Sequence, residues 1–109
     1  MANDFRLRTK ANLQTSLEDV YTASSVTTIV VGMTICNRDS SSRTVDVKVV
    51  TDTSSNADVY LLKGAPVPSG GSLEVMSGNK LVLETTDKIQ ALASVADKLD
   101  VVLSIMEIS

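Results

Sequence analysis

The chain has 109 residues, with ten Lys and Arg against thirteen Asp and Glu, which gives a formal net charge of −3. This length suits a single domain, and the absence of His removes the usual general base and the commonest zinc ligand. Hydrophobic residues make up 43% of the chain but aromatic residues only 3%, and Val is the commonest residue. A chain rich in Val, Ser and Thr is typical of pleated sheets joined by polar loops, so the composition favours an all-β protein.

The start of the chain differs from the rest. Residues 1–16 are polar and show no sustained period, so we expect an N-terminal arm, extended or disordered when free, before a folded domain over 17–109. Residues 1–13 lack the apolar run of a secretory signal, and no stretch reaches the length of a membrane-spanning segment. We therefore expect no membrane partner.

The arm is basic, whereas the domain is acidic. Within the first ten residues Arg6, Arg8 and Lys10 stand against Asp4 alone, while the remaining chain holds seven basic and twelve acidic side chains. Such an arm is suited to docking on an acidic partner, and a frayed, solvated terminus is the alternative. Three basic residues without interleaved aromatic side chains do not predict nucleic-acid binding.

Alternation of apolar and polar residues predicts seven or eight short strands, spaced about ten residues apart. Residues 25–36 and 43–51, joined by a short polar segment, are expected to form an antiparallel hairpin. Residues 86–98 fit an amphipathic helix and a strand-turn-strand unit equally well. Pro66 and Pro68 predict a crossing loop over 64–71. The other expected strands are 17–22, 59–63, 72–76, 81–84 and 99–108. This pattern predicts a single antiparallel β-sandwich, jelly-roll or immunoglobulin-like, with an N-terminal arm.

Several expected strands are apolar on both faces. If Ile29, Val31, Met33 and Ile35 face a two-sheet core, the following apolar residues lie outside it: Val30, Val50, Val102, Met106 and Ile108. Exposed apolar patches on a small domain usually mark an interface, although a loop or the arm covering them is the alternative. We therefore expect a homo-oligomer with Val102, Met106 and Ile108 at the subunit interface.

No residue pattern predicts catalysis, a cofactor or a metal. Cys36 is the only cysteine, so it has neither a disulfide partner within the chain nor a His to activate it. Asp52 and Asp58 lack the spacing of a calcium loop, and Glu84 and Asp87 are more simply solvated acids than a catalytic pair. We expect a protein that is not an enzyme and has no small-molecule substrate.

Five segments between Asp19 and Ser109 carry a resemblance to a known group. They are Val20–Ala23, Ile29–Asn37, Val59–Pro68, Lys80–Glu84 and Val101–Ile108. In these strand-and-turn segments the chain resembles small virion structural proteins of tailed bacteriophages. The resemblance implies an all-β fold, which favours strand-turn-strand over 86–98, and a place in the virion after assembly in the host cytoplasm.

The leading hypothesis is a capsid decoration or cement protein that binds the major capsid protein lattice or other virion proteins and stabilises the head. The residues expected to contact the shell are Phe5, Arg6, Leu7, Arg8 and Lys10. Repetition over a symmetric lattice would multiply weak contacts. One alternative is a tail, neck or baseplate component. Another is a host-glycan-binding module, although sugar sites usually offer stacked aromatic side chains, which are scarce here.

Overall fold

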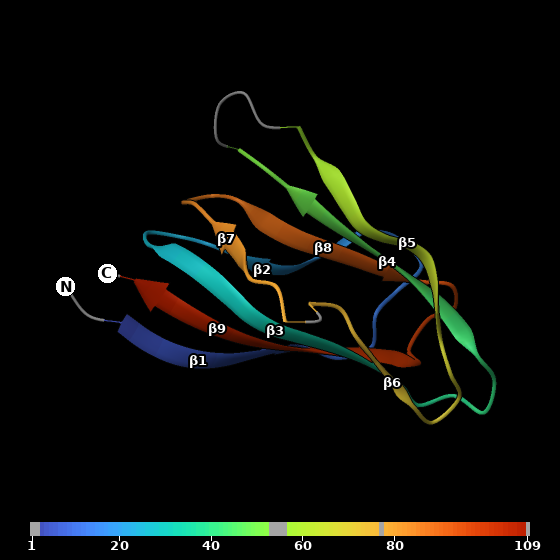
Figure 1. Cartoon of the computed structure of the whole chain (residues 1–109). Coiled ribbons are helices and arrows are strands. Elements are labelled where there is room, and N and C mark those ends of the chain that lie inside the picture. Colours follow the sequence, from blue (N-terminus) through green and yellow to red (C-terminus); the bar gives the residue numbers. More distant parts are fainter. Residues whose placement is uncertain (1–2, 53–56, 77, 109) are drawn as a thin grey trace.

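A computed structural model describes residues 3–52, 57–76 and 78–108, which form two antiparallel sheets packed face to face (Figure 1). The first sheet contains, in order, β1 (Asn3–Lys10), β9 (Leu99–Ile108), β3 (Thr27–Asn37) and then, both paired to β3, β6 (Ser72–Glu74) and β7 (Leu81–Leu83). The second contains, in order, β2 (Glu18–Thr22), β8 (Lys88–Ala93), β4 (Arg43–Val50) and β5 (Val59–Val67). The predicted all-β sandwich is confirmed.

The described residues contain no helix long and apolar enough to cross a membrane. Three segments fall partly outside the described residues. These are the predicted arm at positions 1 and 2, and the polar connections between expected strands at 53–56 and at 77.

Alternating side chains from the two sheets build the core between them. From β9, Leu99, Val101, Leu103 and Ile105 are all buried. From the other sheet come Val45, Val47 and Val49 of β4, and Ile89, Ala91 and Ala93 of β8. Each large aliphatic side chain that leaves water stabilises the fold by roughly 1.5–3 kcal/mol.

A β-bulge in β3 changes which side chains face the core. Val30 lies opposite Ile105 and Gly32 opposite Ser104, so Val31 is the extra residue. The prediction that Val30 lies outside is therefore wrong, since it is fully buried. One inserted residue shifts the alternation by one position, which turns Ile29 outward while Met33 still points into the core.

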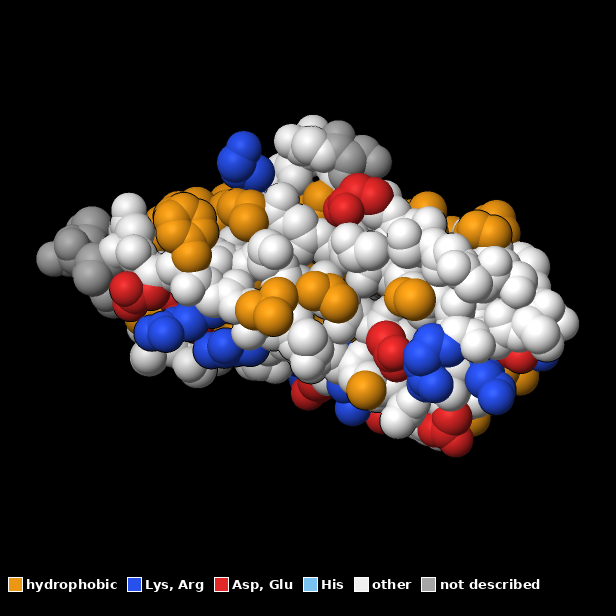
Figure 2. All heavy atoms as spheres, turned by 90° about the horizontal axis from the view of Figure 1, so that it is seen from below, with side chains coloured by type: hydrophobic (Ala, Val, Ile, Leu, Met, Phe, Trp, Pro, Cys, Tyr) orange, Lys and Arg blue, Asp and Glu red, His pale blue; other side chains and the backbone are white. Residues whose placement is uncertain are grey.

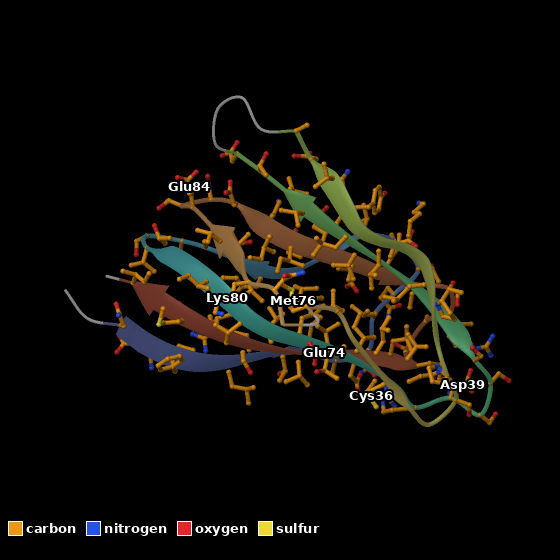
Figure 3. The ribbon with its side chains drawn as sticks, in the orientation of Figure 1. Cys36, Asp39, Glu74, Met76, Lys80 and Glu84 are labelled. Atoms are coloured by element: carbon orange, nitrogen blue, oxygen red, sulfur yellow. The ribbon has the colours of Figure 1, made fainter. Side chains whose placement is uncertain are left out.

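The predicted hairpin between β3 and β4 is also wrong. The two strands lie in different sheets, with β3 beside β9 and β4 beside β8 and β5. Residues 38–42 therefore cross from one sheet to the other at the end of the sandwich where Asp39 lies (Figure 3). A short polar connection between two strands is compatible with either arrangement, because the sequence pattern does not state which sheet the second strand joins.

Asn37 holds this crossing in place. Its side chain is fully buried, and its Nδ2 donates to the carbonyl oxygens of Ser41 at 2.9 Å and Val67 at 3.0 Å. Its Oδ1 accepts the backbone N–H of Asp39 at 2.8 Å. One side chain thus binds the end of β3, the crossing segment and the end of β5.

The strand β5 is longer than expected and continues through Gly64 and Pro66. Proline is tolerated there because β5 is an edge strand. Asp46 lies between the buried Val45 and Val47 of β4, so simple alternation would turn it outward, but it is buried beside the bulges between these strands. Its carboxylate accepts the N–H of Gly64 at 2.7 Å and binds Lys63 Nζ at 3.1 Å.

The described part of the predicted arm belongs to the sandwich. Residues 3–10 form β1, which pairs with β9 over its whole length, from Asn3 opposite Ile108 to Lys10 opposite Val101. Beyond it, Leu13 is fully buried and its N–H donates to the carbonyl of Leu99 at 2.8 Å. The expectation of a free arm is corrected, and the described residues consequently form nine strands.

The ambiguous segment 86–98 is strand-turn-strand, as the resemblance implied. Residues 88–93 form β8, and the chain then turns over 94–98 into β9. Because every second residue of β8 is buried, a period of two fits this segment and a helical period does not.

We expect Asn37→Ala to lower the free energy of unfolding by about 2 kcal/mol, because it leaves buried carbonyl and N–H groups without their partner. Urea denaturation followed by far-ultraviolet circular dichroism measures this. The matched control is Asn79→Ala at an exposed position, which should change stability by less than about 0.5 kcal/mol. Equal stabilities of the two variants would contradict the assigned role of Asn37.

Candidate interaction surface

A row of apolar side chains crosses the outer face of the first sheet. Residues directly opposite each other in antiparallel strands project from the same face. Phe5 of β1 lies opposite Met106 of β9, Met106 opposite Ile29 of β3, and Ile29 opposite Val82 of β7. We call these four residues the apolar row. Its two ends are the most open, with Phe5 74% and Val82 58% exposed.

Further apolar side chains flank the row on the same face. Leu7 is 62% exposed and Val102 40% exposed, while Ile108 is half-buried. Viewed onto this sheet, apolar groups lie across the surface, separated by polar side chains and backbone (Figure 2). The face therefore carries both apolar and polar side chains, and its apolar side chains are spread over the width of the sheet.

The structure brings the predicted interface residues together on this face. Val102, Met106 and Ile108 alternate along β9 and all point away from the core, as expected. Their role at a subunit interface stays a prediction. Sequence reasoning missed Ile29 and Val82, because the bulge in β3 hid the first and only the sheet register places the second beside it.

The basic residues of β1 lie on its other face, and most of them are already paired. The ion pairs are Arg6–Glu107 at 3.5 Å, Arg6–Asp4 at 3.7 Å and Lys10–Glu18 at 3.6 Å. Arg8 has no salt bridge to any described residue, and its Nη1 donates to the carbonyl of Leu7. Exposed pairs of this kind contribute little to stability, roughly 0–1 kcal/mol each. Only Arg8 thus keeps a guanidinium without an acidic neighbour in contact.

Tyr21 of β2 links the two sheets beside β1 through hydrogen bonds to Thr28 and Glu107, and we call these three residues the clasp. Its hydroxyl lies 3.0 Å from Thr28 Oγ1 of β3 and donates to Glu107 Oε2 of β9 at 3.1 Å. Glu107 in turn binds Arg6 of β1. Burial, followed by the hydrogen bond to Glu107 and the negative charge of that residue, raises the pKa of Tyr21 above its usual value of 10.0. The clasp therefore ties the position of β1 to the second sheet.

One acidic side chain considered in the sequence, that of Asp87, serves local structure. Asp87 is buried, and its carboxylate accepts the backbone N–H groups of Asp52 at 2.8 Å and Glu84 at 3.1 Å. The described residues hold no pocket and no cluster of three or more potential metal ligands. Cys36 is half-buried on the outer side of β3, near β6 (Figure 3). Surface contact is therefore the chemistry that this arrangement offers most clearly.

No protein family and no curated protein matches the sequence. Among solved structures, one chain is similar in fold, with a TM-score of 0.53. It comes from Bacillus endospore appendages, which form a family of disulfide-linked pili. The superposition covers 97% of this chain and 86% of that chain at 12% sequence identity. At that identity the likeness shows the fold alone.

We expect Tyr21→Phe to lower the free energy of unfolding by about 1 kcal/mol at neutral pH, because it removes the hydroxyl that joins the sheets. The folded chain holds the Tyr21 proton more tightly than the unfolded chain. This contribution is therefore complete below pH 10.0 and is lost as the pH rises through the higher, folded pKa.

The variant should consequently lose part of the alkaline decline in stability that the original chain shows. Urea midpoints measured between pH 8 and pH 11 test this, with Tyr60→Phe on exposed β5 as the control that keeps the decline. An unchanged alkaline decline in Tyr21→Phe would show that the clasp does not form.

Proposed function

We propose that this chain is a non-enzymatic virion structural protein that decorates the capsid, binding the major capsid protein lattice through the outer face of its first sheet. The observation that carries the proposal is the apolar row, whose ends at Phe5 and Val82 are largely exposed. Apolar side chains that follow one another across neighbouring strands, as these four do, often mark a contact surface of a small domain, unlike apolar residues scattered singly.

The resemblance of five segments to virion structural proteins of tailed bacteriophages supports the choice of a virus particle. A sheet face is a broad surface without a binding pocket, which suits attachment to another broad surface. Each contact can be weak, because a lattice repeats it many times. Of the residues first expected to touch the shell, Phe5 and Leu7 lie on this face, whereas Arg6, Arg8 and Lys10 lie on the other face of β1.

A tail, neck or baseplate position is the second candidate. It is supported by the fold shared with a chain from a family of disulfide-linked pili, since a pilus and a tail are both elongated assemblies. A disulfide-linked polymer needs at least two cysteines in each copy, and this chain has one. Copies of this chain would therefore stack through noncovalent contacts.

The glycan-binding hypothesis gains no support from the exposed aromatic residue of the second sheet. Tyr60 is 42% exposed, but Lys63 Nζ lies 4.6 Å and Lys48 Nζ 5.6 Å from the centre of its ring. Lysine ammonium groups that lie over a ring compete with a sugar for the same surface.

Particles purified with this protein and then stripped of it provide the test. We expect rebinding of the recombinant chain in many copies over the head, and at least an about tenfold loss of affinity for Val82→Lys. The matched control is Thr44→Lys, which adds the same charge at an exposed position of the second sheet and should bind normally.

Cryo-electron microscopy of the rebound particles locates the subunit, and quantitative gels count it. A handful of copies at one vertex would overturn decoration in favour of the tail or neck. Undiminished binding of Val82→Lys would exclude the proposed face.

A further inference from the structure

The free edge of β1 is the longest unbroken edge of the sandwich, and charged side chains are what protects it. It belongs to an eight-residue strand without proline that pairs with β9 in unbroken register. The other edges are guarded in ways that prevent edge-to-edge pairing. β5 contains Gly64 and Pro66 and is bulged, β2 has a register shift, and β6 and β7 have three residues each.

The sequence of β1 is complementary to itself around Arg6. We infer that two copies of the chain pair through this edge, antiparallel and two-fold symmetric, with Arg6 opposite Arg6 of the second copy. This register places Phe5 opposite Leu7 of the second copy, and Asp4 opposite Arg8 of the second copy. Each of these pairs occurs twice, as a two-fold interface requires.

The inferred pairing satisfies the side chains that the single chain leaves exposed. Phe5 and Leu7 are 74% and 62% exposed and gain a cross-strand apolar neighbour. Arg8, which has no salt bridge to a described residue, gains Asp4. Arg6 contacts Glu107 at 3.5 Å, so the central arginines keep an acidic partner when Asp4, which lies 3.7 Å from Arg6 in the single chain, binds Arg8 of the second copy.

Neighbouring registers are less favourable. Centring the pair on Leu7 sets Arg6 against Arg8 of the second copy twice, and like charges directly opposite each other destabilise a strand pair. Centring it on Phe5 sets Phe5 against Phe5 and Asp4 against Arg6 of the second copy, but it places Leu7 opposite the polar Asn3. It also leaves Arg8 without an acidic neighbour and overlaps only residues 3–7 of the described strand. The register centred on Arg6 pairs both exposed apolar side chains with each other and gives Arg8 an acidic partner.

The two-fold axis runs perpendicular to the sheet, so both apolar rows face the same side of one continuous sheet. The dimer is inferred from β1 alone and goes beyond the proposed function. If that function also holds, two copies present one enlarged binding face to the shell.

Charge reversal of the full chain tests the register. Asp4→Arg sets two arginines against each other and Arg8→Asp sets two aspartates against each other, so each variant alone should dimerise at least about tenfold more weakly than the original chain. An equimolar mixture of the two restores both ion pairs and should form heterodimers. Sedimentation velocity over a concentration series measures all four samples, and urea denaturation verifies that each variant is folded.

A disulfide trap tests the same register independently. In a Cys36→Ser background, Arg6→Cys should cross-link into a dimer on mild oxidation because the two positions lie directly opposite each other, whereas Leu7→Cys should not. An original chain that stays monomeric at high concentration, a mixture of charge variants that stays monomeric, or cross-linking at position 7 instead of 6 would overturn the inference. Loss of the dimer with normal particle binding would remove this inference and leave the proposed function standing.

Discussion

The structure depends on β9, a ten-residue strand that pairs with β1 on one side and β3 on the other. Its alternation separates two sets of side chains. Leu103 and its inward neighbours form one wall of the core, while Val102 and Met106 lie on the outer face. Because both flanking strands take their register from β9, the core and the outer surface are determined together. A shift of one residue in this strand would exchange the two.

Two kinds of contact surface result, and different residues supply them. The sheet face carries the apolar row, which reaches from Phe5 to Val82 and suits a broad surface of another protein. The edge of β1 offers backbone groups together with Asp4 and Arg8, which suit a second copy of the same strand. Phe5 belongs to both surfaces. Edge pairing leaves the sheet face open, so the inferred dimer and the proposed lattice contact are compatible with each other.

Sequence alternation predicted the strands whose period of two is unbroken, notably β4 and β9, and the sandwich that they build. It failed where a single residue determines which face a side chain takes, or where a single connection determines which sheet a strand joins. The extra residue Val31 reversed the expected faces around Val30. The crossing after Asn37 depends on a buried amide that a polar turn sequence does not reveal. In β1, the alternation of Phe5 and Leu7 with charged residues was present but short, and its partner lies at the other end of the chain.

That separation has a consequence for the order of events during synthesis. Asn3 pairs with Ile108, so β1 cannot join the sheet before β9 has been made. Until β9 leaves the ribosome, residues 3–10 have no sheet to join, and contacts between such distant segments form slowly. The edge through which we infer that copies meet therefore forms only after β9 has left the ribosome, so pairing through it cannot begin while residues 99–108 are still being made.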